Sequence, residues 1–355
     1  MDVRDFYRHR MYGPYNVGPR PDSLGRIDPE LTIVEGAYAT PREVGADRSL
    51  TGALYDAEGG LVGQSVRGGQ RHLHLTEQAS AAEPSAHEPE TAVYLGPLMR
   101  HFGHFLLEVL PRLWVFDEHR VRKVYFHPFR LRKDVPAYVR DTLEAVAGAG
   151  VEIRLIEEPT TFARLLVPSL TFRLNRMGSP AFGDWSQRFA ERVAPQPRGG
   201  EFVYMSRSRL EEKKRRTLNE EPLEALFASR GFEVVHPQEM AFFDQIARMR
   251  ACRLLAGCSG SALHHALFMP KNSAVVGFDF RFTGSQHAIE AMGDHTGLHF
   301  ACLRELGHGG DFEFDESYLP VIEQALDELL GDWPARLSTP FGRAPRKYVE
   351  SGWAT

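Results

Sequence analysis

Apolar and polar positions alternate in blocks along the second half of the chain. Short apolar runs of the kind that form buried parallel strands are expected at Phe202 to Met205, Phe232 to Val235, Leu254 to Ala256 and Ala274 to Phe278. Between these runs, apolar residues recur at helical spacing. Asn219 is a favourable N-cap for the helix that follows the first strand. This alternation predicts a doubly wound α/β unit.

The first half of the chain shows a similar but less regular alternation. Strands are expected at Leu31 to Val34, Val93 to Leu95, Val124 to Phe126, Val151 to Ile156 and Leu165 to Val167. Helices are expected at His101 to Phe116, with a kink at Pro111, at Pro136 to Ala147 and at residues 182–194. The polar, Ala-rich residues 77–91 are expected to form a surface loop.

The segment Pro195 to Gly200 is rich in Pro and Gly and is the expected domain boundary. It gives a first domain at residues 1–195, with an irregular N-terminal arm and a hairpin around Asp56 to Gly60. The second domain is expected at residues 200–335, followed by a tail at 336–355. A chain of 355 residues is long enough for two domains.

Composition narrows the class of protein. A hydrophobic content of 43% and a charged content of 25% are globular values. The net charge of −5 gives no reason to expect nucleic acid or an anionic membrane as the main partner. Cys252, Cys258 and Cys302 lack a metal-binding spacing and suggest reduced thiols in a cytoplasmic protein. The first residues do not resemble a signal peptide, and no apolar run reaches the roughly 20 residues of a membrane span.

The stretch Ala256 to Ala262 places two glycines and two serines between an expected strand and an expected helix. Helix N-termini bind phosphate because their N–H groups are unpaired. Arg207 and Arg209 follow another expected strand, and ligands of open α/β sheets bind beyond the carboxyl ends of the strands. The pattern suggests a diphosphate site. The alternatives are an ordinary strand-to-helix turn and a solvated loop carrying these arginines together with Arg215 and Arg216.

Several segments, taken in order, resemble family 61 of the glycosyltransferases. They are Gly103-His104-Phe105-Leu106-Leu107-Glu108, Tyr204-Met205-Ser206-Arg207, Arg216-Thr217-Leu218-Asn219-Glu220, Gly231 to Val235, Phe242 to Ile246, Gly257 to Leu263 and Leu267 to Pro270. The resemblance covers residues 94–280, about half the chain. Their order and spacing together carry the resemblance, since no single segment is specific.

The resemblance implies a GT-B-like fold, in which two Rossmann-like doubly wound domains face a central cleft. In that fold the second domain holds a nucleotide diphosphate sugar such as a UDP-sugar, and the first contacts a glycan or small-molecule acceptor. The implied donor-binding residues are Arg207, Arg209, Arg216, Gly257, Ser259, Gly260, Ser261, Ala262 and His265. The chain has no Asp-x-Asp motif, which favours arginines over a metal ion as the stabiliser of the leaving group, with no cofactor.

His104 and Glu108 lie four residues apart and would share one face of a helix. An imidazole oriented by a carboxylate is suited to act as a general base. Spacing alone favours a structural His104, with Glu108 paired to Arg112, also four residues away. The family resemblance favours the catalytic pair.

The expected activity is a metal-independent, inverting transfer of a hexosyl or pentosyl group to a hydroxyl, as in bacterial surface polysaccharide synthesis. Relatives often carry Asn at the positions of His101 and His265, which puts the substrate in doubt more than the reaction. A non-catalytic nucleotide-sugar-binding protein and a nucleotide-sugar epimerase are the alternatives, and a homodimer stays open. His72 and His74 alternate as on a strand face, but no third metal ligand lies near them in the sequence.

Overall fold

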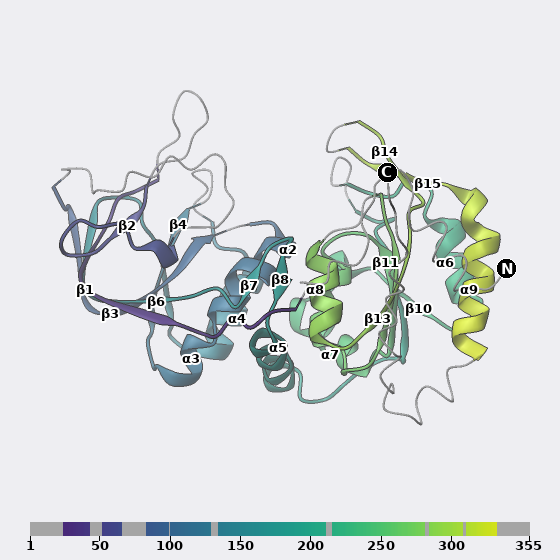
Figure 1. Ribbon diagram of the computed structural model, residues 1–355, viewed down its shortest axis with the longest axis horizontal. Coiled ribbons are helices and arrows are strands. Elements are labelled where there is room, and N and C mark those ends of the chain that lie inside the picture. Colours follow the sequence, from purple (N-terminus) through teal and green to yellow (C-terminus); the bar gives the residue numbers. More distant parts are fainter. Residues whose placement is uncertain are drawn as a thin grey trace, which may run out of the picture.

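The computed structural model describes residues 24–42, 52–65, 83–98, 100–128, 134–210, 215–280, 284–307 and 310–331. The expected tail, His72 and His74, and most of the expected N-terminal arm lie outside these residues. The protein is a mixed α/β molecule with two large sheets at opposite ends and helices packed between them (Figure 1). Among the described helices, none combines the length and the apolar character needed to cross a membrane.

The first sheet has six strands and a mixed topology. Its order is β2 (Leu54–Tyr55), β1 (Leu31–Ala39), β6 (Thr160–Pro168), β3 (Ala86–Leu98), β4 (Lys123–Pro128) and β5 (Glu152–Leu155). Strand β1 runs antiparallel to both neighbours, and the strands from β6 to β5 run parallel. Helix α4 (Ala137–Ala147) connects β4 to β5, as the alternating pattern predicts.

Strand β3 begins at Ala86, so the prediction that residues 77–91 form a surface loop is wrong for residues 86–91. This segment is polar and contains Pro89, which hides it from a pattern search. Its backbone pairs with β6, and the register shifts between Glu88 and Thr91, around the proline. The Glu88 carboxylate is buried and accepts a hydrogen bond from the Tyr125 hydroxyl at 2.7 Å. Pairing and one buried hydrogen bond therefore outweigh local propensity here.

The helix expected at His101 to Phe116 forms as four short pieces. They are α2 (Phe102–His104), the π-helical turn η2 (Phe105–Val109), the 3-10 turn η3 (Leu110–Arg112) and α3 (Val115–Glu118). The Leu110 N–H donates to the carbonyl of Phe105, five residues back, which widens the helix. Pro111 has no N–H to continue an α-helical ladder, so the hydrogen-bond pattern changes at this residue, as the predicted kink requires.

The second sheet has five strands, all parallel. Its order is β10 (Glu233–Val235), β9 (Phe202–Met205), β11 (Leu254–Cys258), β12 (Ala274–Phe278) and β13 (Thr296–Phe300). The predicted bounds of β9 and β12 are confirmed. Two small antiparallel pairs accompany the large sheets: β7 (Phe172–Arg173) with β8 (Met177–Gly178), and β14 (Leu303–Glu305) with β15 (Phe312–Phe314).

Helices cover both faces of the second sheet. Helices α6 (Glu221–Ala228) and α9 (Leu319–Gly331) lie on the outer face, and α7 (Phe242–Ala251), η5 (Leu263–Phe268) and α8 (Gly284–Met292) face the first sheet (Figure 1). Successive residues of β9 point to opposite faces, so Tyr204 joins the outer core and Val203 joins the inner one.

The inner core is continuous between the two sheets. Buried residues of β3, η2, α5 (Pro180–Val193), α7 and β11 belong to one apolar cluster. Trp185 stacks on Phe189 with ring centroids 5.2 Å apart. The side-chain amide of Gln187 donates to the carbonyls of Leu267 and Met269 at 2.8 and 2.9 Å. Helix α5 therefore packs on the helices of the second sheet, although it precedes the Pro- and Gly-rich segment.

The prediction that Asn219 caps a helix is wrong. Helix α6 begins at Glu221, and Glu220 occupies the N-cap position without a side-chain capping bond. The Asn219 side chain instead holds β15: it accepts from the Phe314 N–H at 2.8 Å and donates to the Phe314 carbonyl at 3.0 Å. A partner 95 residues away cannot be read from local sequence.

Candidate functional site

The carboxyl ends of β9 and β11 lie side by side at the point where the strand order of the second sheet reverses. Strand β9 leads to β10 on one side, and β11 leads to β12 on the other. In open α/β sheets a ligand crevice forms at such a switch point. Ser206 and Arg207 follow β9, and Ser259 follows β11. Several of the residues that the sequence predicts for a diphosphate thus lie at this switch point.

Glycines allow the two strand ends to come together. A Cβ on Gly257 would lie 2.7 Å from the carbonyl oxygen of Met205 in the neighbouring strand. Gly260 has a φ of +151°, and a Cβ there would lie 2.7 Å from Nη1 of Arg207. Nη1 donates to the Ser259 carbonyl at 2.5 Å. The turn Ser259–Ser261 therefore wraps closely around the Arg207 guanidinium.

Glu220 anchors the backbone of Arg207 from below. Its carboxylate accepts from the Arg207 N–H and from the Tyr204 hydroxyl, both at 2.9 Å, and it is 0% exposed. Burial raises the pKa of Glu220 to about 7, although these hydrogen bonds oppose the rise. Burial also lowers the pKa of the Arg207 guanidinium. The sequence places Glu220 in a segment that resembles the family, but it does not predict this role.

Arg215 lies next to Arg207, whereas Arg216 turns toward a carboxylate. Arg215 has a φ of +61°, and its guanidinium lies 5.2 and 5.0 Å from the ring centroids of Phe280 and Phe312. Burial lowers the pKa of His101, and the charges on Arg215 and Arg207 lower it further. The Arg216 side chain lies 3.6 Å from the carboxylate of Asp311. The arginine cluster expected from the sequence includes Arg215, but the expected donor-binding residues do not.

Arg209 lies apart from these residues. Its guanidinium is exposed and forms an ion pair with Glu239 at 3.0 Å. The structure therefore brings together Arg207 and the Gly-Ser turn but directs Arg209 to the surface near η4 (Pro237–Glu239).

The helix expected after the turn forms as a short 3-10 helix, η5. Ala262 precedes it without a side-chain cap, and the six residues of η5 provide a small dipole. His265 lies within η5, is 1% exposed and stacks on Phe102 at 5.4 Å. Its Nδ1 lies 3.0 Å from the Ala262 carbonyl, and burial lowers its pKa to about 4. His265 thus packs beneath the turn, among aromatic rings.

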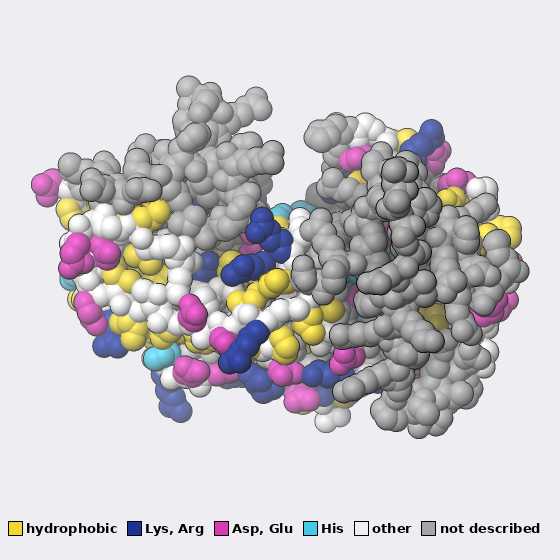
Figure 2. Space-filling view, in the orientation of Figure 1, with side chains coloured by type: hydrophobic (Ala, Val, Ile, Leu, Met, Phe, Trp, Pro, Cys, Tyr) yellow, Lys and Arg dark blue, Asp and Glu magenta, His cyan; other side chains and the backbone are white. Residues whose placement is uncertain are grey.

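The histidine segment of the first half, His101 to Glu108, lies beside the Gly-Ser turn. A Cβ on Gly103 would lie 3.0 Å from the Cβ of Ser261, so α2 touches the Gly-Ser turn. Nδ1 of His104 lies 2.6 Å from Oε2 of Glu108, and the His101 and His104 rings are 5.4 Å apart. Figure 2 shows histidine side chains at the base of a notch between the two halves of the molecule.

Arg112, the alternative partner for Glu108, is 2% exposed. Its guanidinium donates to the Pro168 carbonyl and, at 3.2 Å, to the Gln64 carbonyl. Burial lowers the pKa of Arg112 to about 10. Its hydrogen bonds therefore tie η3 to β6 and η1 (Gly63–Ser65) within the first half.

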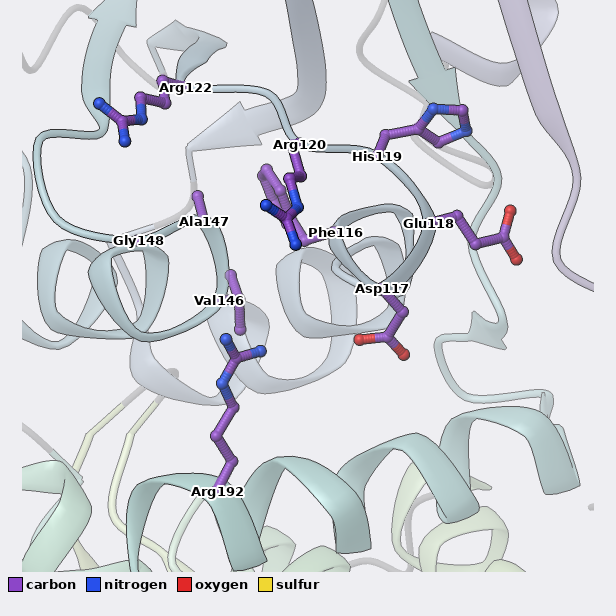
Figure 3. Close-up of a pocket in the computed structure, with 10 residues that line it drawn as sticks. All are labelled: Phe116, Asp117, Glu118, His119, Arg120, Arg122, Val146, Ala147, Gly148 and Arg192. Atoms are coloured by element: carbon purple, nitrogen blue, oxygen red, sulfur yellow. The ribbon is translucent and has the colours of Figure 1, made fainter.

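A separate cavity of about 590 Å³ lies between α3, the end of α4 and α5. Charged side chains from different segments line it and point in different directions (Figure 3): Asp117, Glu118, Arg120, Arg122 and Arg192. All five are exposed. None of the residues at the switch point lines this cavity. Its charges are solvated, in contrast to those around Arg207.

Within the described residues, no group of three or more His, Cys, Asp or Glu side chains could hold a metal ion.

Residues 102–276 match the family model described as Glycosyltransferase 61. The matched region includes the histidine segment, Arg207 and the Gly-Ser turn. No curated protein matches the chain. Residues 102–276 therefore belong to glycosyltransferase family 61, the family that the motifs of the chain resemble.

Proposed function

We propose that the protein transfers a hexosyl or pentosyl group from a nucleotide diphosphate sugar to a hydroxyl of a glycan or small molecule, with inversion and without a metal ion. In this proposal the two sheets belong to the two domains of a GT-B-like enzyme, with boundaries at residues 1–195 and 200–335 and a tail at 336–355. A cytoplasmic location and a part in bacterial surface polysaccharide synthesis rest on composition and family resemblance.

The observation that carries the proposal is the pair of guanidiniums at the switch point. Arg207 and Arg215 are close enough to interact electrostatically, and like charges at close range destabilise each other. In the described part of the chain, neither side chain forms an ion pair with a carboxylate. Glu220 and Asp311 lie within electrostatic range of Arg207 but form no ion pair with it. A diphosphate between the two guanidiniums would provide a direct ionic partner, and guanidinium forks match phosphate oxygens well. We assign the donor diphosphate to Arg207, Arg215 and the turn Ser259–Ala262.

The other residues that the sequence predicts for donor binding have indirect roles in this assignment. Gly257 and Gly260 permit the close backbone approach. Arg216 supports the segment through Asp311, and His265 supports the turn from beneath. Arg209 would need to leave Glu239 to reach a ligand at the switch point.

The acceptor step follows from the His104–Glu108 pair. The imidazole Nδ1–H donates to the Glu108 carboxylate, so Nε2 carries the lone pair. Nε2 takes the proton of the acceptor hydroxyl while the hydroxyl oxygen bonds to the anomeric carbon. The bond from the anomeric carbon to the phosphate oxygen breaks, and its electron pair leaves with the nucleotide diphosphate. Glu108 stabilises the imidazolium that forms.

A test begins with the full chain and a panel of UDP-, GDP- and ADP-linked sugars, with UDP, GDP and ADP as binding probes. We expect one nucleoside diphosphate to bind and its sugar to be transferred equally well with EDTA and with added Mn²⁺. Hydrolysis products without transfer to any hydroxyl acceptor would contradict the transferase proposal. Loss of activity in EDTA that Mn²⁺ restores would contradict the metal-free mechanism.

A further inference from the structure

A hydrogen-bonded network of buried polar side chains leads from the second sheet to His264, which lies three residues after Ser261 of the Gly-Ser turn. His264 Nδ1 lies 3.1 Å from Oε1 of Gln286 on α8. Nε2 of Gln286 donates to Oε1 of Glu290 at 3.0 Å and to the Leu263 carbonyl at 3.4 Å. None of the established motifs of the sequence includes Gln286 or Glu290.

These contacts fix the tautomer of His264. The Leu263 carbonyl and the Glu290 carboxylate only accept hydrogen bonds, so the Gln286 amide must turn its NH₂ toward them. Its carbonyl oxygen then faces His264, where only an Nδ1–H can donate to it. Burial lowers the pKa of His264 to about 4, so the ring stays neutral and Nε2 keeps its lone pair.

His299 on β13 lies at the other end of this hydrogen-bonded network. Its Nδ1 lies 2.8 Å from Oδ2 of Asp279, and its Nε2 lies 2.9 Å from Oε1 of Glu290. Asp279, Glu290 and His299 are 4%, 5% and 5% exposed. Burial opposes a charge on His299, but the two carboxylates raise its pKa to about 10. A charged His299 donates through both nitrogens and keeps Glu290 ionised, as an acceptor for Gln286.

His264 belongs to the same neighbourhood as the proposed catalytic pair. Its ring interacts electrostatically with His101 and His104, and it follows Ser261, which touches Gly103. Glu290 is buried, and its Oε1 accepts one hydrogen bond from His299 and one from Gln286. Part of what holds this carboxylate in the interior therefore also orients the Gln286 amide toward His264.

We propose that Asp279, His299, Glu290 and Gln286 hold His264 as the Nδ1–H tautomer so that its Nε2 accepts a hydrogen bond from a hydroxyl of the bound sugar substrate. The proposal rests on the proposed function for the identity of that substrate. Gln286 and Glu290 are positioning residues, since they act through His264.

Histidine ¹⁵N chemical shifts test the tautomer without any activity. In full-length protein labelled at histidine, we expect His264 to show a protonated Nδ1 and an unprotonated Nε2. Gln286→Leu should convert this signal to a mixture of tautomers, and His119→Leu, at the surface cavity, should leave it unchanged. A wild-type His264 protonated at Nε2 overturns the proposal.

Binding and kinetics test the hydroxyl contact. With the donor and acceptor found for the wild type, His264→Leu should raise the KM of the sugar substrate by about tenfold, the value of one hydrogen bond. His264→Gln, which keeps an acceptor oxygen, should recover most of this loss. Affinity for the nucleoside diphosphate alone should stay unchanged. An unaltered KM in a folded His264→Leu protein overturns the contact. Failure of the wild type to bind any nucleoside diphosphate instead counts against the proposed function, and the tautomer result still decides the positioning.

Discussion

Nδ1 of His104 and Oε2 of Glu108 meet at 2.6 Å across a π-helical turn. His104 is 32% exposed at its side chain, while Glu108 is 9% exposed, so the imidazole lies at the surface of the site and the carboxylate behind it. This order suits a base that meets a substrate and is held from behind.

Removal of the imidazole should abolish most of the turnover. We expect His104→Ala to reduce kcat by about 10²–10⁴-fold, the usual contribution of a general base. Glu108→Gln should have a smaller effect because the amide still accepts from Nδ1–H. Affinity for the nucleoside diphosphate should change little in both variants, since Arg207 and Arg215 lie on the other half of the molecule. Steady-state kinetics and calorimetric binding measure these effects, with His119→Ala as the control. A folded His104→Ala protein with near wild-type turnover would rule out the base.

Replacement of either half-buried arginine, Arg207 or Arg215, should weaken binding of the donor. Lys cannot reproduce the guanidinium fork, so Arg207→Lys and Arg215→Lys should each lower affinity for the nucleoside diphosphate by about tenfold or more. Arg154→Lys, at an exposed pair with Glu152 on β5, is the matched control. Isothermal titration with UDP and GDP supplies the affinities. Wild-type affinity in Arg207→Lys would place the diphosphate elsewhere.

The buried carboxyl of Glu220 should make stability depend on pH. Its pKa rises from 4.5 to about 7 on folding, so the native state binds more protons than the unfolded state between these values. The contribution of protonated Glu220 to the free energy of unfolding is complete below pH 4.5. It decreases as pH rises to about 7, by on the order of 3 kcal/mol. Glu220→Gln should flatten this part of the curve. Denaturant unfolding from pH 5 to pH 8 measures it, and an unchanged slope in Glu220→Gln would contradict the raised pKa.

A methyl group between β9 and β11 should destabilise the second sheet. In Gly257→Ala the new Cβ would meet the Met205 carbonyl at 2.7 Å, and backbone on both sides must shift. We expect a loss of about 1–3 kcal/mol in the free energy of unfolding. Gly63→Ala is the control, because a Cβ there meets nothing within 4 Å. Equal stability of the two variants would show that the strands separate at little cost.

The sequence predicts the second sheet well because its strands are short, apolar and buried on both faces. Strands β9 and β12 begin and end where the pattern places them. Strand β3 is longer than predicted because its first residues are polar and gain their conformation from β6. Periodicity reports burial on one element, and it does not report a partner strand or a buried hydrogen bond.

The candidate site was only partly predictable for a similar reason. Arg207 and the Gly-Ser turn follow strand ends, which sequence can locate. Whether Arg215 or Arg216 lies beside Arg207 depends on the backbone, which has a φ of +61° at Arg215. A pattern of charged residues in the sequence does not report backbone conformation. Glu220 and Gln286 depend on contacts between distant segments. Such residues carry no local signal beyond a polar side chain in an otherwise ordinary helix start or helix face.

The continuous inner core bears on how this enzyme could be recombined with its relatives. Because α5 packs its aromatic face on η5 and α7, an exchange of halves cut at residues 195–200 would separate Phe189 from Phe243 and Phe268, which its ring meets at 6.3 and 6.4 Å. A hybrid protein would then present mismatched apolar surfaces at its seam. Crossovers upstream of α5, near the β7–β8 pair, keep this packing within one parent and are the better junctions for chimeric glycosyltransferases.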